Sequence, residues 1–481
     1  MLWFAMLVAP ALVAYWVWSV IVCQMLFFLI RPSVERGMWV LLSYLFTLGG
    51  SSGWTYDGGP VWITWLTYTI IPLMFLHTLL RPHQKFNSRI LIPLIFLCII
   101  SGLSAWINQA NWVHVLAWWA HFLRYPILFL LLISLPINFS TYKVWIKAYM
   151  GLALLQIPTT VLKFVFVTEN VDAIFGTMHG GLTGNMGLAV LVGICIALGL
   201  GLSNKNESKY ILVALGLFVP LIVGSVNFPL LMGVVVGIWI ILDWGVKYLI
   251  SIIKVKRKFI YIFIVGILAI FPIMGSILAM PKSQTSELQQ LLEGQFNNPR
   301  TYEAFVNPDL SFVPYSSRQM FIATTVEWFR QNPSDLLLGS IGPRIGLGHQ
   351  AGKLSNAKDG LSPIAHINEA VGVPVTMTQY SVQLPRTLLE VGLIGLIGFW
   401  WLFWSVRPGR KVLQDARLDP WLAGLVLGFG GIWWLQVLLC VLYADIWRID
   451  HLNFGFWLCA AALYRRPTHK QDETVPALTS L

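Results

Sequence analysis

Charged residues are scarce in this sequence. Of its 481 residues only 11% are Asp, Glu, Lys or Arg, whereas 57% are hydrophobic. Soluble globular domains carry roughly 25% charged residues, so this composition excludes an ordinary soluble protein. We therefore expect lipid to be the main solvent around the chain.

Cysteine is rare, and the common zinc and nucleotide-binding motifs are missing. All five cysteines lie in apolar runs, with no CxxC pair and none in residues 281–383; they are Cys23, Cys98, Cys195, Cys440 and Cys459. This distribution excludes a disulfide scaffold and a zinc site and predicts free, packed thiols. No HExxH or Walker-type motif occurs. We expect no metal site and no cofactor.

Long apolar runs, separated by short polar segments, fill most of the chain. A membrane-spanning helix needs about 20 apolar residues. The candidate spans are 3–30, 37–53, 60–80, 89–107, 112–135, 143–167, 181–203, 209–226, 229–250, 259–280, 385–406, 419–443 and 451–464. They predict an all-α polytopic membrane protein with about 12–13 transmembrane helices.

The net charge of +11 comes from short basic clusters just beyond the apolar runs. The clusters occupy every second connection: Arg31 and Arg36; Arg81, Lys85 and Arg89; Lys143 and Lys147; Lys205 and Lys209; Lys254, Lys256, Arg257 and Lys258; Arg407, Arg410 and Lys411; Arg465 and Arg466. Such alternation marks the cytoplasmic side of a membrane protein. It indicates membrane lipids as partners and no nucleic acid. The opposite connections, including 281–383, are predicted to be extracytoplasmic.

The connection 281–383 is too long for a simple loop. Segments 284–294 and 317–331 are predicted helices, Asn332 and Pro333 end the second one, and a glycine-rich turn follows. We predict four parts: an N-terminal bundle of about ten transmembrane helices over 1–280, an extracytoplasmic loop or cap over 281–383, and C-terminal transmembrane helices, about three, over 384–465. The last part, 466–481, is a predicted disordered cytoplasmic tail.

Three arginines, Arg318, Arg344 and Arg386, lie near predicted helix ends on the outer side. The guanidinium fork suits phosphate groups because it donates two hydrogen bonds and stays charged. A lipid pyrophosphate at the outer interface is a partner that fits this chemistry. Each arginine alone is equally well explained by a neighbouring carboxylate or a lipid headgroup.

Ionisable residues also lie inside a predicted span. His121 and Arg124 are three residues apart, on one face of the expected helix 112–135, and a buried charge at membrane depth needs a functional or a pairing role. For acid–base chemistry the candidates are His366, His349 and Glu390. Any single histidine is more often ordinary loop or interface chemistry.

Three patches resemble the O-antigen ligase and O-antigen polymerase superfamily. The first patch is Phe175 and Gly176 with the segment 184–189 (GNMGLA). The second is Arg318 followed by 332–333 (NP) and 338–343 (LGSIGP), and the third is 384–395 (LPRTLLEVGLIG). Their order along the chain resembles that of the family. Two positions depart from its pattern: Val382 precedes the third patch where ligases usually have a histidine, and Val226 stands where an arginine is frequent.

The resemblance implies a glycosyltransferase of cell-surface polysaccharide biosynthesis in the bacterial inner membrane. It would polymerise or ligate glycan from a polyprenyl-pyrophosphate-linked donor onto a glycan or lipid acceptor, without a metal. Arg318, Arg344 and Arg386 would then bind pyrophosphate, and His366, His349 or Glu390 would act as the base. The alternative is a transporter or flippase of a lipid-linked or amphipathic substrate that uses His121 and Arg124.

Overall fold

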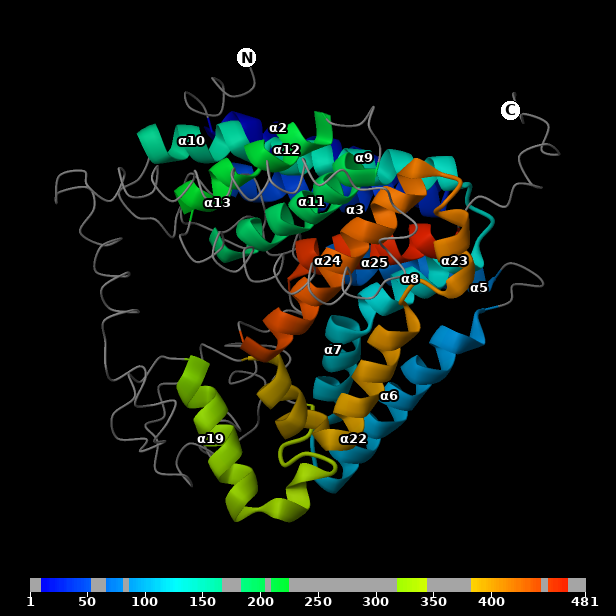
Figure 1. The fold of residues 1–481 in the computed structure, drawn as a ribbon. Helices are drawn as coiled ribbons and strands as arrows, with labels where there is room; N and C mark the ends of the chain where they lie inside the picture. The colour runs from blue at the N-terminus through cyan, green and yellow to red at the C-terminus, as the bar shows by residue number, and fades with distance from the viewer. Residues whose placement is uncertain are drawn as a thin grey trace.

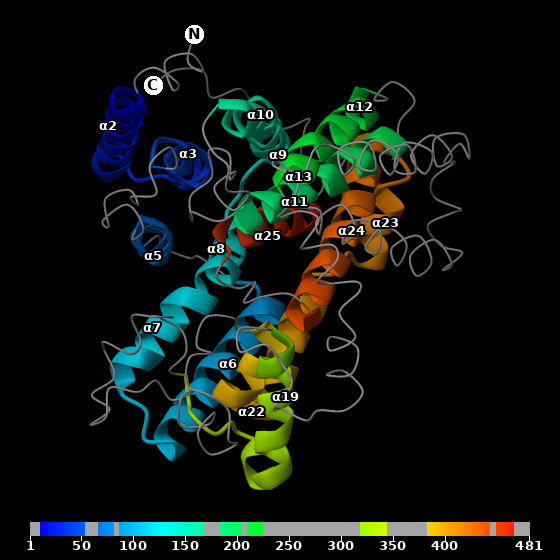
Figure 2. The ribbon, with the colours of Figure 1, turned by 90° about the vertical axis from the view of Figure 1, so that its left-hand side faces the viewer.

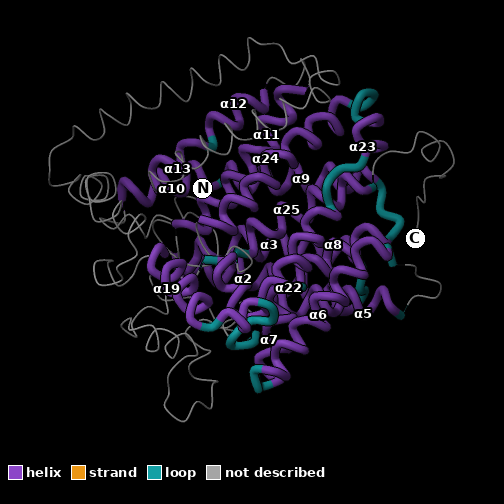
Figure 3. Tube along the Cα trace, turned by 60° about the horizontal axis from the view of Figure 1, so that its bottom comes forward, coloured by secondary structure: helices purple, strands orange, loops and turns teal. Residues whose placement is uncertain are grey.

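The computed structural model describes residues 10–52, 66–80, 86–166, 183–203, 209–224, 318–343, 382–442 and 449–465. Within these ranges the regular structure is helical and contains no strand (Figure 3). The helices are α2 (Pro10–Ile30), α3 (Val34–Ser52), α5 (Leu66–Leu79), α6 (Ser88–Ile107), α7 (Trp112–Phe122), α8 (Arg124–Ser134), α9 (Phe139–Leu154), α10 (Gln156–Phe166), α11 (Thr183–Ser203), α12 (Lys209–Gly216), α13 (Phe218–Gly224), α19 (Arg318–Gln331), η5 (Pro333–Leu336), α22 (Gln383–Ser405), α23 (Arg410–Asp415), α24 (Pro420–Leu442) and α25 (Asp450–Tyr464).

Four of the described helices are long and apolar enough to cross a membrane: α6, α11, α22 and α24. The pair α7 and α8 passes the same test as one bent unit. Within the described residues the all-α class is thus confirmed, and four or five units are long and apolar enough to cross a membrane. The predicted spans 229–250 and 259–280, the helix 284–294 and the tail 466–481 lie outside the described residues.

Three predicted spans, 112–135, 143–167 and 209–226, are each broken into two helices in the structure. In every case a proline is the third residue of the second helix: Pro126 in α8, Pro158 in α10 and Pro220 in α13. A proline ring clashes with the carbonyl of the residue four positions earlier. That residue is the last one of α7, α9 and α12, respectively. The prolines therefore explain where each predicted span divides into two helices.

Helices α6 and α22 run antiparallel and side by side (Figure 1). Ser104 bonds to the backbone of Glu390 at one end of the pair, and Phe96 meets Trp401, with ring centroids 6.0 Å apart, nearer the other. The predicted loop helix 317–331 is confirmed as α19, which ends before Asn332 and Pro333 and lies beside the start of α22.

Helices α11 and α24 also pack closely against each other. Glycine residues in both helices make this close approach possible. A Cβ at Gly199 would lie 2.2 Å from the carbonyl oxygen of Gly424, and one at Gly428 would lie 2.8 Å from the carbonyl oxygen of Cys195. Small residues let two backbones approach this closely, as they do in membrane helix pairs. Helix α25 packs against α8, α9, α11 and α24, while α2, α3 and α5 stand next to one another at one edge (Figure 2).

Candidate functional site

Helix α22 is interrupted at Gly392. Its φ of 66° and ψ of −169° are not helical, and a left-handed φ is strained for residues that carry a Cβ. The break exposes backbone groups that an intact helix would satisfy internally. A Cβ at this position would also lie 2.3 Å from the carbonyl oxygen of Leu337. Only glycine fits here, because the backbone of Leu337 and Leu338 touches it directly.

The segment 337–343, which we call the docked turn, satisfies those backbone groups. The amides of Ser340 and Ile341 donate to the carbonyl oxygen of Leu389, at 2.9 and 3.2 Å, and the amide of Ile394 donates to the carbonyl oxygen of Leu337, at 3.2 Å. Two glycines of the turn, Gly339 and Gly342, have positive φ values of 82° and 65°. The glycine-rich stretch predicted as a turn is therefore a turn that completes a broken helix.

Helix α6 and the loop helix α19 hold the docked turn in place. The side-chain amide of Asn108 donates to the carbonyl oxygen of Gly339 at 3.2 Å, and the indole nitrogen of Trp328 donates to the hydroxyl of Ser340 at 2.8 Å. The Ser104 hydroxyl donates to the carbonyl oxygen of Glu390 at 2.6 Å. Segments far apart in the chain thus meet at one end of the α6–α22 pair.

Directly beside the break, Arg386 and Glu390 form a buried ion pair one turn apart on α22. Nε of Arg386 lies 3.1 Å from Oε1 of Glu390, and the two side chains are 0% and 1% exposed. The other carboxylate oxygen, Oε2, accepts a bond from the indole nitrogen of Trp118 at 2.7 Å. The guanidinium carbon of Arg386 lies 5.1 Å from the centre of the Phe122 ring. Glu390 therefore fixes Arg386 while α7 supplies the aromatic wall.

A second buried polar cluster joins α5, α7, α8 and α25. Arg124 forms an ion pair with Asp450, donates to the Thr67 hydroxyl at 2.7 Å and lies 4.1 Å above the Tyr68 ring. The hydroxyl of Tyr68 in turn shares a hydrogen bond with Nδ1 of His121. Arg124 is 2% exposed at its side chain, so its charge is balanced inside the bundle, as a charge at membrane depth must be.

The two clusters are connected through aromatic side chains of α7. Phe122 contacts the His121 ring edge to face, with centroids 5.4 Å apart, and it also carries the guanidinium of Arg386 on its face. The ring of Trp118, the partner of Glu390, also contacts Phe122, with ring centroids 4.8 Å apart and ring planes inclined by 38°. A change in the position of α7 would therefore affect both ion pairs.

The predicted site residues fall into three groups. Arg386 and Glu390 come together, and so do His121 and Arg124. Arg318 is the first residue of α19, and its side chain lies outside the described part of the structure. Arg344, His349 and His366 also lie outside the described residues.

One expectation about this site was wrong. His121 and Arg124 do not share a face of one helix, because the chain breaks at Leu123 and bends by 51° between α7 and α8. They meet instead through Tyr68 of α5. Asp450 and Trp118 were not predicted as residues of this site. Asp450 carried a signal, since it is a lone carboxylate at the start of the apolar run 451–464 and a natural counterion for a buried arginine.

Comparison with known proteins adds no family assignment: no protein-family model matches the chain, and no curated protein matches it.

Proposed function

We propose that this protein is a glycosyltransferase that moves glycan from a polyprenyl-pyrophosphate-linked donor to a glycan or lipid acceptor at the outer face of the bacterial inner membrane. One observation carries the proposal. The second and third patches of the superfamily resemblance, the turn 338–343 and the segment 384–395, lie against each other, and the third patch contains the buried Arg386–Glu390 pair. Two patches that only their order linked in the sequence are therefore in contact, which supports the proposal that they belong to one site.

The distribution of basic residues supports the outer placement of this site. Arg89, Arg407 and Lys411 line one cavity at the end of the α6–α22 pair that is remote from the docked turn. Clustered Lys and Arg residues mark the cytoplasmic side of a membrane protein. The docked turn, at the opposite end of α6 and α22, would then face outward, where the lipid-linked donor is presented.

In the proposed reaction a hydroxyl oxygen of the acceptor attacks the anomeric carbon of the donor sugar. The new glycosidic bond forms as the bond to the pyrophosphate oxygen breaks, and polyprenyl pyrophosphate leaves with the electron pair. Arg386, with Arg318 and Arg344, stabilises the negative charge of the leaving group, which is electrostatic catalysis. His366 or His349 accepts the hydroxyl proton.

The structure changes the role that we assign to Glu390. Each of its carboxylate oxygens already accepts a hydrogen bond, one from Arg386 and one from Trp118. Taking a proton from a substrate would disrupt this arrangement. We therefore assign Glu390 as a positioning residue that fixes the guanidinium of Arg386, and we leave proton transfer to the histidines.

The test uses a deletion strain and measures the pool of polyprenyl-pyrophosphate-linked glycan. Removing one member of a buried ion pair typically costs about 3–5 kcal/mol, whereas replacing both members by apolar residues of similar volume is often neutral. The informative variant is therefore the double substitution Arg386→Met with Glu390→Leu. Arg330→Gln is the matched control. Arg330 lies in helix α19, outside the ion pair, and its side chain is 80% exposed.

We expect wild type and the Arg330 control to clear the lipid-linked pool. The double variant should insert in the membrane at the wild-type level and leave the pool accumulated. If the double variant clears the pool, the arginine pair has only a structural role. If wild type itself leaves the pool unchanged, glycan transfer is the wrong function.

Transport is the second candidate, and the Arg124–Asp450 pair favours it. This pair and His121 lie among α5, α7, α8 and α25, where a transporter could bind an anionic amphiphile within the membrane. Proteoliposomes that contain the purified protein and a lipid-linked substrate separate the two functions. Movement of the substrate across the bilayer without new glycosidic bonds would establish transport and contradict the enzyme.

A further inference from the structure

Three cations from three segments meet at the end of the molecule remote from the docked turn. Arg89 at the start of α6, Arg407 just after α22 and Lys411 in α23 line a cavity of about 340 Å³. Its remaining walls are mostly apolar and include Leu463 and Val412. Among the described residues around this cavity there is no carboxylate. Such a cavity fits an anion.

A second cavity of about 390 Å³ shares Arg89 and Arg407 with the first. Its other walls are mainly apolar and aromatic, with Trp404 and Trp433 next to Phe429. The guanidinium carbon of Arg407 lies 4.5 Å from the Trp404 ring centre and 4.3 Å from that of Trp433. Arg407 thus lies between the cavity lined by the three cations and the cavity lined by aromatic residues. Its guanidinium group packs against both indole rings.

Trp404 is 52% exposed. Exposed tryptophans beside basic residues are typical of the level of lipid headgroups in a membrane protein. A ligand for the two adjoining cavities needs an anionic group for the three cations and a long apolar part for the aromatic walls. A free phosphate ion has the first feature only.

We propose that these adjoining cavities bind one anionic glycerophospholipid. Its phosphate is held by Arg89, Arg407 and Lys411, and its acyl chain lies along Trp404 and Phe429. The inference is independent of the glycan-transfer proposal, because this site lies at the opposite end of α6 and α22 and takes no part in that chemistry.

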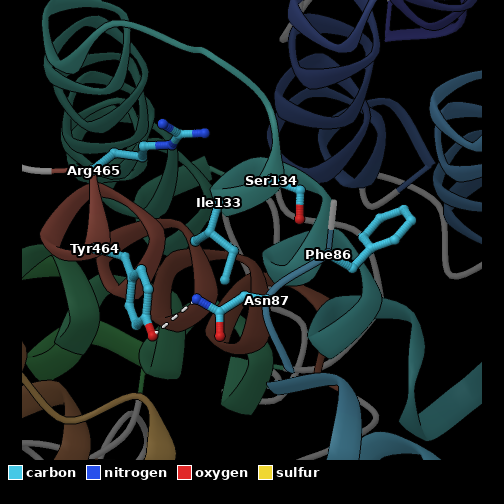
Figure 4. A pocket seen from close by; sticks show the side chains of 6 residues that line it. All are labelled: Phe86, Asn87, Ile133, Ser134, Tyr464 and Arg465. Carbon is cyan, nitrogen blue, oxygen red and sulfur yellow. Dashed lines mark hydrogen bonds between the residues drawn. The ribbon is translucent and has the colours of Figure 1, made fainter. Parts of the chain in front are cut away.

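The surrounding contacts indicate what the lipid does. Tyr464 lines the cationic cavity and a neighbouring cavity of about 390 Å³ that also includes Arg465 (Figure 4). The side-chain amide of Asn87 donates to the Tyr464 hydroxyl at 3.2 Å, which joins the start of α6 to the end of α25 (Figure 4). A phosphate bound next to this contact bridges α6, α22, α23 and α25 and stabilises their packing.

The experiment measures the unfolding temperature of the purified full-length protein in a neutral detergent. Three additions are titrated at equal concentrations: phosphatidylglycerol, phosphatidylcholine and inorganic phosphate. Ligand binding to the folded state raises the unfolding temperature in proportion to the logarithm of ligand concentration. We expect a rise with phosphatidylglycerol and none with the other two additions.

The double substitution Arg89→Gln with Lys411→Gln is the test variant, because both residues are exposed and the stacked Arg407 stays in place. A cation near the lipid surface contributes about fivefold to affinity, so the two substitutions should weaken binding about 25-fold. Arg417→Gln is the control variant. Arg417 is exposed, lies just after α23 and lines neither cavity, so this variant should bind phosphatidylglycerol as tightly as wild type does.

Three results would overturn the proposal. An equal rise with inorganic phosphate would mean a free-anion site, and an equal rise with phosphatidylcholine would mean unspecific lipid binding. Equal phosphatidylglycerol affinity of the double variant and the Arg417 control would mean that the cavity cations do not bind the headgroup.

Discussion

Gly392→Ala should release the docked turn from α22. The substitution places a Cβ 2.3 Å from the carbonyl oxygen of Leu337, a backbone atom that can only move away. The backbone conformation of Gly392, which is essentially restricted to glycine, costs an alanine about 1–3 kcal/mol, and displacing the turn removes the bond from the Ile394 amide to Leu337, worth about 1 kcal/mol. The docked state should therefore lose about 2–4 kcal/mol.

Amide hydrogen exchange of residues 336–343 measures this loss locally. The amides of Ser340 and Ile341 donate to Leu389 only while the turn is docked, so their exchange reports on opening. A loss of this size should speed their exchange by about 30- to 900-fold. Unchanged exchange at both amides would refute the argument that the turn depends on the break in α22.

Gly151→Ala is the matched control. Gly151 lies inside α9, and a Cβ there meets nothing within 4 Å. Alanine is the better helix former, so this variant should be more stable by about 0.5–1 kcal/mol. Exchange of residues 336–343 should stay at the wild-type rate in the control.

Three further predictions concern the unfolding temperature in detergent. Arg124→Ala and Asp450→Ala should each lower the free energy of unfolding by about 3–5 kcal/mol. The double variant should lose less than the sum of the two, and additive losses would contradict the ion pair. Trp118→Phe keeps an aromatic ring but loses the bond to Glu390, so stability should fall by about 1.5–3 kcal/mol, and a wild-type temperature would count against that bond. Gly199→Ala forces α11 from the α24 backbone and should cost about 1–3 kcal/mol; no loss would mean that the two helices do not approach so closely.

The helix breaks show where sequence reasoning stopped short. Periodicity and length predicted 112–135 as one span, and the apolar residues on both sides of Leu123 supported that interpretation. Pro126 carried the opposite signal, since its ring excludes the carbonyl of Phe122 from a continuous helix. A proline inside an apolar run can kink a span or end a helix, and the choice depends on what packs against the bend.

The candidate site was predictable only in part. Arg386 and Glu390 were singled out separately, one for pyrophosphate and one as a base, although their spacing of one helical turn permits an ion pair. The structure shows that pair, buried. Asp450 was missed because its partner, Arg124, lies more than 300 residues earlier in the chain, and no local pattern links two such positions.

The sequence by itself determined the class of this protein. Apolar runs, scarce charge and alternating basic clusters predict an all-α membrane protein, because a backbone in hydrocarbon must satisfy its own hydrogen bonds, and the described residues are helical as predicted. Glycine and proline positions marked the turn at 338–343 and the end of α19. Tertiary structure alone decided that this turn completes the broken helix at Gly392, that Trp118 reaches Glu390 and that Arg124 pairs with Asp450. These contacts join distant segments, and only the packing of whole helices brings such partners within bonding distance.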